Sequence, residues 1–560
     1  MSRLGTAGLL AATLVALTGQ DAEACGCFAP PDPSVPIVQA GERILFSVEN
    51  GVVTAHIQIQ YAGEAKDFGW LLPLPSVPTL KLGTEELFSQ LINVTQPRYL
   101  LTTTTTGACA GLGQDILRVQ GAAAENSSSE FGGTSTPFTP LVIESSIGPY
   151  DYAVLRADRK DEMLQWLTDN RYFIPVGTEE TVGPYIRAGA YFLALRLKSG
   201  KAAGDIQPVV LEYPSDLPMI PIILTSVAAQ PNMGIQVWML GSGRAIPRNY
   251  NHVVVNDSQI DWLTQGRNYN DVVIRAVGET PGKHAFVTEY AGTSDVMKNV
   301  LDGPNRFGST TELATLSDPA DFVEYLFLKN FASSTTLGAR TFPPLLKSLV
   351  LAQIPLPAGL TNVTEDQFLS RLRFWLGTWR AQHPEQFVGW SPTFDAPTLA
   401  AQLEEKIVVP ARAAGALFRS FPYLTRLYTT LSPEDMTSDP VFSFNAGLPE
   451  IARDHRATLR IDCGLGGSVT TSPATLTTEQ GWVFNLPNAS AGPDLDRGPG
   501  ALRVETLAEE GTPLVLVDNG KVIAGKVGGC GCSSVEPLLA FGLLALLRRR
   551  RPPDSQKSVT

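Results

Sequence analysis

The stretch that decides the fold runs from residue 43 to residue 61 and reads RILFSV, then ENG, then VVTAHIQIQY. An Asn-Gly pair between two apolar runs is a strong signal for a β-hairpin with a tight turn. In the second run, residues 52–61, apolar side chains alternate with polar ones, which include His56. Such alternation places one face of a strand on a core and the other near water. The pattern therefore predicts a hairpin with one buried face and a solvated His56.

Further strands follow this hairpin and outnumber the helices between residues 40 and 290. Strands are expected at residues 152–155, 191–198, 207–213, 220–226, 235–240 and 252–255, and helices at residues 84–93 and 158–170, capped by Thr84 and Asp158. The apolar, proline-broken stretch 67–75 predicts an extended edge or covering strand. Hairpin-length spacings favour antiparallel pairing. The sequence therefore predicts an α+β fold whose N-terminal domain, residues 25–300, is mostly antiparallel β-structure.

The pattern changes beyond about residue 310. Apolar residues recur at spacings of three and four, with Asp, Ser or Thr near the starts, in residues 318–329, 364–375, 398–418 and 423–431. This spacing predicts a helical subdomain over residues 310–445. Strand patterns return in residues 457–526, including 513–517 and, after an Asp-Asn-Gly turn, 521–523, and they predict a small C-terminal β module. The polar, small-residue stretch 121–139 predicts a long loop.

Composition and charge limit the class of protein. The chain has 560 residues, of which 44% are hydrophobic and 18% are charged, so we expect a globular protein and not a disordered, collagen-like or coiled-coil one. Acidic residues outnumber basic residues by 55 to 43, which gives a net charge of −12. Binding to nucleic acid needs a surplus of Lys and Arg to neutralise phosphates, so no nucleic-acid partner is expected.

The N-terminus has the pattern of a secretory signal peptide over residues 1–24. Arg3 precedes an apolar stretch at residues 9–17, and Ala-Glu-Ala follows directly before Cys25. A small-x-small site of this kind predicts cleavage between Ala24 and Cys25, so the protein is expected to be exported. Lipidation of Cys25 is an alternative, but the residues just before it lack the apolar side chain usually found three positions upstream.

The C-terminal tail, residues 528–560, combines two cysteines, Cys530 and Cys532, with an apolar run at residues 535–547 and four arginines at 548–551. Thirteen residues are too few to cross a bilayer as a helix, which needs about 20. The arginines should stay cytoplasmic while the short run pauses in the membrane, so the cysteines would face a processing enzyme on its outer side.

This order of features resembles the MYXO-CTERM sorting signal of myxobacteria and their relatives. The resemblance implies a C-terminal sorting protease as a partner, and a tail cysteine as the processing and lipid-attachment point. Cys532 is the first choice for that cysteine and Cys530 the second. The processed cysteine would hold the protein on the membrane, so we expect it in the cell envelope or on the cell surface, at the outer membrane, with release outside the cell as the alternative.

The remaining cysteines allow several disulfides. In an oxidising compartment Cys109 and Cys463 could bridge and close a long loop, and Cys25 or Cys27 could also take part. Cys463 as a buried free thiol is a further alternative. The Cys-x-Cys spacing differs from a zinc clip and the five histidines are scattered, so neither a metal nor another cofactor is expected.

No sequence motif identifies a catalytic residue. The chain has no G-x-S-x-G elbow and no HExxH motif. A calcium-loop pattern that starts at Asp494 and ends at Glu505 has Pro499 where a glycine must turn the chain, so a simple turn is the better interpretation. Aromatic residues could form a sugar-binding face, but core packing explains most of them equally well. These residues are Phe68, Trp70, Trp238, Trp262 and Trp482.

Several segments of the body resemble, in order, the bacterial DUF2330 family. They are QAGERILF (39–46), IQIQY (57–61), DFGWLLP (67–73), IGPYD (147–151), IQP (206–208), MIP (219–221), QPNMGI (230–235), YLTRL (423–427) and LSPE (431–434). The resemblance spans roughly residues 25–445. It implies a secreted or surface protein of uncharacterised function, and it supplies no catalytic residues.

Two hypotheses for the function follow. The first is a surface-anchored envelope protein that binds or scaffolds without catalysis, with an unknown ligand. The second is an extracytoplasmic hydrolase that acts on glycan or peptide. A pocket in which His284 meets Glu289, or His455 meets Asp462, would favour the hydrolase. The absence of a recognisable reactive motif favours the binding protein.

Overall fold

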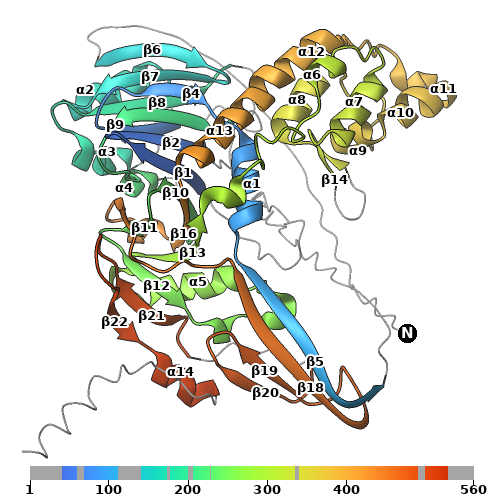
Figure 1. The fold of residues 1–560 in the computed structure, drawn as a ribbon. Helices are drawn as coiled ribbons and strands as arrows, with labels where there is room; N and C mark the ends of the chain where they lie inside the picture. The colour runs from blue at the N-terminus through green and yellow to red at the C-terminus, as the bar shows by residue number, and fades with distance from the viewer. Residues whose placement is uncertain are drawn as a thin grey trace, which may run out of the picture.

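The computed structural model describes residues 41–59, 69–110, 140–172, 177–199, 206–227, 229–334, 340–489 and 498–527 (Figure 1). Several predictions fall outside these residues. They are the signal peptide with its cleavage site at Ala24 and Cys25, Cys27, the loop at 121–139, and the tail with Cys530 and Cys532.

A ten-stranded sheet forms the centre of the molecule, in the order β22-β21-β12-β13-β16-β10-β1-β2-β9-β4. Its strands are β1 (Glu42–Glu49), β2 (Val52–Ile59), β4 (Thr79–Leu82), β9 (Val209–Pro214), β10 (Met233–Gly241), β12 (Asn251–Val255), β13 (Ala285–Thr293), β16 (Tyr423–Leu431), β21 (Ala501–Thr506) and β22 (Leu514–Asp518). The predicted hairpin is confirmed as β1 and β2, which pair antiparallel around Asn50 and Gly51. Only β1 with β10 and β12 with β13 run parallel, so antiparallel pairing dominates.

Strand β16 corrects the helix predicted at 423–431. It lies between β10 and β13 and pairs antiparallel with both of them. Leu424, Leu427 and Leu431 are buried, and so are polar residues between them, such as Thr425 and Arg426. A strand buried on both faces loses the period of two, so its apolar spacing can imitate that of a helix.

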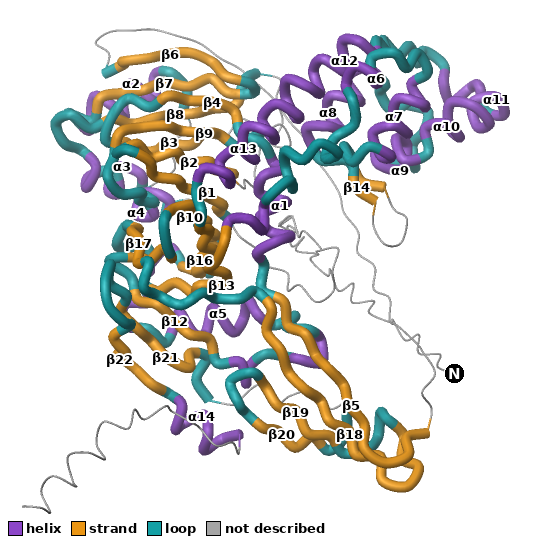
Figure 2. The backbone as a smooth tube through the Cα atoms, viewed as in Figure 1, coloured by secondary structure: helices purple, strands orange, loops and turns teal. Residues whose placement is uncertain are grey.

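A second, antiparallel sheet lies against one face of the central sheet (Figure 2). Its order is β3-β8-β7-β6, and its strands are β3 (Gly69–Leu74), β6 (Leu141–Ile147), β7 (Tyr150–Arg156) and β8 (Tyr191–Leu197). Leu72 and Leu193 of this sheet share a core with Ile44, Phe46 and Leu211 of the central sheet. Helix α2 (Lys160–Asp169) packs on a separate cluster that includes the other face of β7 and β8.

Helices cover the opposite face of β1 and β10. Helix α1 (Glu85–Thr95) and helix α13 (Val409–Ser420) bury Phe88 and Phe418 against Leu45 and Trp238. The predicted Thr84 cap is confirmed, because its hydroxyl accepts a hydrogen bond from the Glu86 amide.

The prediction for His56 was wrong. The residue does lie on the side of β2 opposite the inter-sheet core, but its side chain is only 8% exposed. Burial, with a smaller contribution from nearby Lys81, lowers the pKa of the His56 imidazole to about 4, so it is neutral at pH 7.

The helical region after residue 310 is confirmed as far as residue 420. Its helical segments are α6 (Thr310–Leu313), α7 (Pro319–Leu328), α8 (Pro344–Gln353), α9 (Glu365–Ser370), α10 (Leu372–Phe374), η8 (Trp375–Trp379), α11 (Arg380–Gln382), η9 (Pro384–Phe387), α12 (Ala396–Leu403), η10 (Glu404–Val408) and α13. They surround their own core, which includes Phe322, Leu346, Phe368 and Leu399.

Strands are present in the region 457–526 as predicted, except at 521–523, and N-terminal strands share their sheets. Strand β18 (Asp454–Ser468) runs parallel to β5 (Arg98–Ala110), and β19 (Ala474–Thr478) and β20 (Val483–Leu486) extend that sheet, whereas β21 and β22 join the central sheet. A disulfide joins Cys109 of β5 to Cys463 of β18, 354 residues apart. This is one of the pairings that the sequence left open.

The remaining elements complete the chain. They are α3 (Thr178–Thr181), η2 (Gly183–Tyr185), α4 (Ile222–Thr225), β11 (Arg244–Pro247), η4 (Asp257–Gln259), η5 (Trp262–Thr264), α5 (Tyr269–Gly278), η6 (Pro281–Lys283), η7 (Ser294–Met297), β14 (Ser333–Ser334), β15 (Arg340–Thr341), η11 (Pro433–Asp435), β17 (Phe442–Asn445) and α14 (Gly520–Val527). Two predicted strands are helical, because 220–226 contains α4 and 521–523 lies in α14. The Asp158 cap was also wrong, since α2 begins at Lys160 and Arg159 occupies the cap position.

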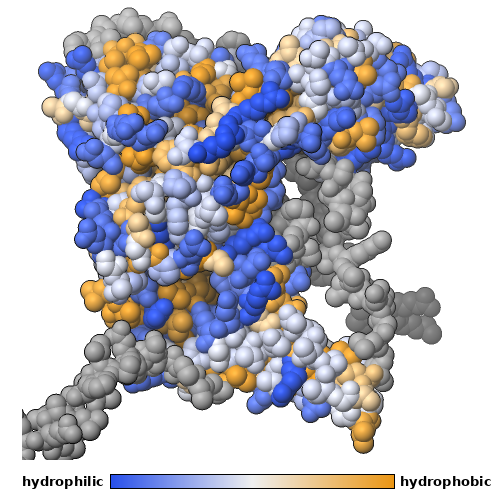
Figure 3. All heavy atoms as spheres, in the orientation of Figure 1, coloured by the Kyte–Doolittle hydropathy of each residue, from blue (hydrophilic) through white to orange (hydrophobic). Residues whose placement is uncertain are grey.

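The α+β class is confirmed. Hydrophilic and hydrophobic residues are interspersed over the face seen in Figure 3. Within the described ranges, every helix is too short or too polar to traverse a bilayer.

Candidate functional site

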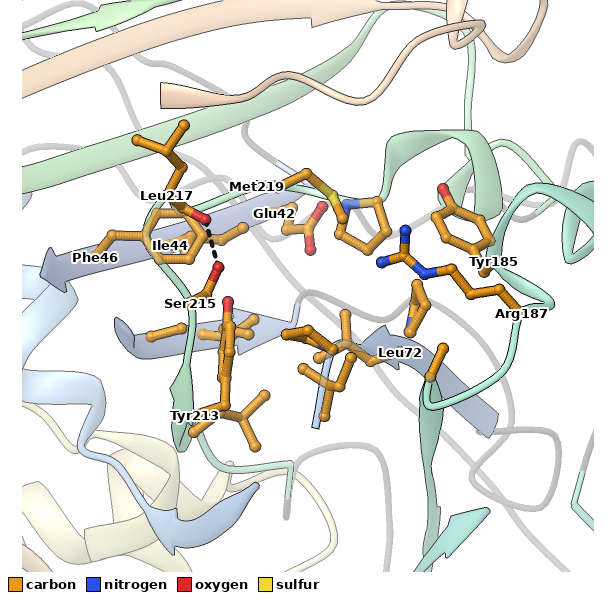
Figure 4. Close-up of a pocket in the computed structure, with 18 residues that line it drawn as sticks. Glu42, Ile44, Phe46, Leu72, Tyr185, Arg187, Tyr213, Ser215, Leu217 and Met219 are labelled. Carbon is orange, nitrogen blue, oxygen red and sulfur yellow. Dashed lines mark hydrogen bonds between the residues drawn. The ribbon is translucent and has the colours of Figure 1, made fainter. Parts of the chain in front are cut away.

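A cavity of about 140 Å³ lies between the central sheet and the second sheet. Most of its lining residues are apolar, including Ile44, Phe46, Leu72 and Leu211 (Figure 4). A cavity of about 150 Å³ with such walls is large enough to hold a benzene ring. The space between the sheets can therefore take a small apolar molecule.

Glu42 is the buried acidic group of this pocket. Alternation along β1 places it on the same face as Ile44 and Phe46, so its carboxyl points into the inter-sheet space and not toward solvent. The residue is 8% exposed, and its Oε2 has no hydrogen-bond partner among the described residues. Burial raises the pKa of the Glu42 carboxyl from 4.5 to about 7. The acid can thus donate a hydrogen bond when protonated and accept one when ionised.

Apart from the Tyr213 phenol on β9, the other polar groups of the pocket lie in two loops. Arg187 is exposed, its side chain has no partner within the described parts of the chain, and Figure 4 shows it reaching toward Glu42. The Tyr185 hydroxyl donates to Asp439 at 2.7 Å, and the Ser215 hydroxyl donates to the Leu217 carbonyl at 3.0 Å. Tyr185 and Ser215 are thus engaged within the protein, and Glu42 and Arg187 are the acidic and the basic side chain of the lining that can meet a ligand.

The segment 215–221 separates this pocket from a second hollow. Ser215 and Met219 border the first pocket, Asp216 and Pro218 border a cavity of about 330 Å³, and Leu217 borders both. Backbone hydrogen bonds from Ile220 to Pro440 and from Phe442 to Pro218 fix this segment against β17. The two cavities are therefore divided by a single, well-anchored strip of chain.

His284 and His455 do not form the two pairs, with Glu289 and with Asp462, that would favour a hydrolase. The Nε2 atom of His284 lies 2.9 Å from the Asp435 carbonyl oxygen, and its ring stacks on Tyr250, away from Glu289. The His455 imidazole faces Glu479 at 3.4 Å and not Asp462. Neither histidine lines the inter-sheet pocket.

Glu289 belongs to a buried polar network at the centre of the large sheet. The Arg426 Nε donates to the Glu289 carboxylate at 2.5 Å, and the Tyr269 hydroxyl donates to the same carboxylate at 2.7 Å. The two remaining guanidinium nitrogens donate to Gln236 and Thr95. Because these groups satisfy one another and lie outside the pocket, we assign the network a structural role.

The sugar-binding face does not form from the predicted aromatic residues. Trp238, Trp262 and Trp482 are at most 3% exposed and belong to the core, and Phe68 lies outside the described residues. Core packing thus explains the three tryptophans.

Within the described ranges, no three residues of the His, Cys, Asp and Glu types gather where they could hold a metal ion. Of the acidic residues in the calcium-loop pattern, Glu505 pairs with His252 at 3.2 Å, and Asp494 lies outside the described residues.

A family model described as "Uncharacterized protein conserved in bacteria (DUF2330)" matches residues 21–332, more than half of the chain. The chain belongs to the DUF2330 family. The match contains most of the segments on which the resemblance rested, whereas residues 423–427 and 431–434 lie beyond it. No curated protein and no solved structure matches this DUF2330 protein.

Sequence reasoning missed the polar groups of the pocket in this DUF2330 protein. Glu42 and Arg187 are separated by 145 positions, and no motif links them. One signal was available: Glu42 lies two residues before Ile44 and four before Phe46, so the alternation of the strand places all three on the core face.

Proposed function

We propose that this DUF2330 protein is exported, held at the cell surface by its processed tail, and binds a small apolar ligand between its two sheets without converting it. The observation that carries the binding role is the Glu42 Oε2 atom, which has no hydrogen-bond partner among the described residues and lies in a mostly apolar cavity. An unsatisfied buried polar group costs about 1–3 kcal/mol, which a ligand with a matching polar group can recover. The pocket therefore favours a ligand that offers a hydrogen bond to Glu42.

The pocket geometry supports binding over hydrolysis. Acyl or glycosyl transfer needs a nucleophile beside a base, or two facing carboxyl groups. Among the residues that line the pocket, Glu42 is the only carboxyl, and the Ser215 hydroxyl donates to a backbone carbonyl and not to a base. We therefore keep the hydrolase as the weaker alternative.

Three features support export and anchoring. The first is the signal-peptide pattern that ends at Ala24, and the second is the Cys109–Cys463 disulfide, since disulfides persist mainly in oxidising compartments. The third is the MYXO-CTERM-like tail with Cys532 and Cys530. The acidic net charge of −12 disfavours direct binding to anionic lipid, so a lipid on the tail cysteine is the proposed attachment.

We expect toluene, a neutral molecule of the right size, to bind the pocket and stabilise the protein. At a tenfold excess over Kd, binding to the folded state alone adds about 1.4 kcal/mol to the free energy of unfolding, measured by urea denaturation. Ala190→Leu, which adds three carbons to the pocket wall, should abolish this gain, and so should Met219→Phe. Ala188→Leu is the control, because Ala188 is exposed on the same loop and does not line the pocket. Equal stabilisation of all four proteins would contradict binding at this site.

We expect the protein isolated from its native envelope to lack both ends of the translated sequence. Intact-mass spectrometry should show a chain that begins at Cys25 and ends near Cys530 or Cys532, with added lipid mass on a tail cysteine. A native protein that retains the arginines at 548–551 would contradict the sorting proposal. Expression in a host without the sorting protease serves as the control, since the tail should then remain.

A further inference from the structure

We infer that the inter-sheet pocket takes a small apolar monocarboxylate, whose carboxylate lies between the Glu42 carboxyl and the Arg187 guanidinium. This inference rests on the proposed binding function and names the chemical class of its ligand. The size of the cavity, its mostly apolar lining and the charges of Glu42 and Arg187 support this ligand class.

The cavity volume sets the size of the ligand body. About 140 Å³ accommodates one aromatic ring or a short branched chain, and no larger group. The walls contributed by Ile44, Phe46 and Leu72 offer no hydrogen bond, so this body must be apolar. A sugar or a polar amino-acid side chain would lose its hydration there without replacement.

The polar end of the ligand meets Glu42 and Arg187, the acidic and the basic side chain of the lining. Glu42 and Arg187 form no ion pair with each other, although Figure 4 shows the arginine directed toward the acid. The proposed carboxylate lies between them and contacts both. Such a group needs an acceptor for the guanidinium and an acceptor or donor for the carboxyl, depending on whether Glu42 is protonated.

Charge selects a carboxylate for this position. In apolar surroundings Glu42 is held neutral up to about pH 7, so the pocket and its rim carry the single positive charge of Arg187. A monoanion makes this set neutral, with the Glu42 proton donated to one ligand oxygen and the Arg187 guanidinium paired with the other. An ammonium ligand would need ionised Glu42 and would leave one positive charge uncompensated. The anion is thus the better match.

The other titratable groups that line the pocket do not supply a second charge. Tyr213 and Tyr185 face the pocket, and burial raises the pKa of both phenols, so they stay neutral. Asp439 lies behind Tyr185 and is held by its hydroxyl and by the Ile223 amide. Glu42 is therefore the group whose protonation should govern ligand binding.

The test is calorimetric titration of the full chain with three probes of one shape: benzoate, benzamide and benzylammonium. We expect benzoate to bind at least tenfold more tightly than benzylammonium at pH 6. Above about pH 7, its affinity should fall about tenfold per pH unit, because the carboxylate must take up a proton at Glu42 in order to bind. Tighter binding of benzylammonium, or benzoate binding that does not change between pH 6 and pH 9, would overturn the inference.

Two variants assign the effect to the two side chains. Glu42→Gln keeps a donor but cannot ionise, so benzoate should still bind and the loss of affinity above pH 7 should disappear. Arg187→Gln should lower the affinity for benzoate at least tenfold and change the affinity for benzamide less than threefold. Arg267→Gln, which removes an exposed arginine outside the pocket lining, is the matched control and should change neither.

The outcomes separate the ligand class from the proposed function. If toluene and benzamide bind but benzoate does not, the pocket is a binding site and the monocarboxylate inference is wrong. If none of the probes binds, including toluene, the proposed binding function itself is wrong.

Discussion

Replacement of Arg426 by methionine is expected to lower the free energy of unfolding by about 3–5 kcal/mol, because it leaves the Glu289 carboxylate buried without its counter-ion. The two side chains are at most 1% exposed, and the Arg426 Nε donates to the Glu289 carboxylate at 2.5 Å. Water cannot replace the lost partner at the centre of the sheet. Urea denaturation at pH 7 measures the change, and the double variant Arg426→Met with Glu289→Gln should recover part of the loss.

The matched control is Arg340→Met, which removes an arginine from another Arg–Glu pair. Arg340 bonds Glu324 through two nitrogens, but the side chains are 30% and 39% exposed. Surface pairs contribute about 0–1 kcal/mol, so a small loss is expected. Losses of similar size in the two variants would show that burial does not decide the strength of the central pair.

The stability of the Glu42→Gln variant is expected to rise, relative to the wild type, as pH increases from 4.5 to 8. The folded-state pKa of Glu42 is about 7 against an ordinary value of 4.5, so between these values the folded wild type binds more protons than the unfolded chain. Its stability therefore falls with rising pH, by about 3 kcal/mol from this residue alone. The neutral glutamine has no such loss, so the difference between the two proteins should grow by about that amount.

Urea denaturation of both proteins across this pH range measures the difference. Other buried acids, such as Asp257 with a pKa raised to about 7, titrate in both proteins and cancel. Glu49→Gln is the control, because Glu49 is an exposed carboxyl on the same strand and should show no pH-dependent difference. A constant difference between Glu42→Gln and the wild type would mean that Glu42 is already ionised in the folded protein.

The sequence predicted correctly those elements that are determined by residues close together in the chain. The β1–β2 hairpin follows from Asn50-Gly51 and an alternating strand, and α1 follows from the Thr84 cap. The pattern failed at β16, because a strand covered on both faces keeps no period of two. Its content of threonine, a β-branched residue at 425, 429 and 430, was the signal that favoured a strand.

The candidate site was less accessible from the sequence. Its lining comes from β1, β2, β3, β9 and three loops, and only the packing of two sheets brings them together. The alternation of Glu42 with Ile44 and Phe46 could have identified a carboxyl on a core face. Nothing in the local sequence indicates that Arg187 and Glu42 line the same pocket.

The position of β16 shows that the family match does not cover the whole folded domain. The family model ends at residue 332, yet β16, at residues 423–431, is inserted between β10 and β13 in the middle of the sheet. A polypeptide truncated at 332 would lack the strand that joins β10 to β13, so these two strands would have unpaired edges. Glu289 would also lose its counter-ion, Arg426. The segment that the family model recognises, residues 21–332, is therefore shorter than the segment needed to complete the central sheet, which extends at least to residue 431.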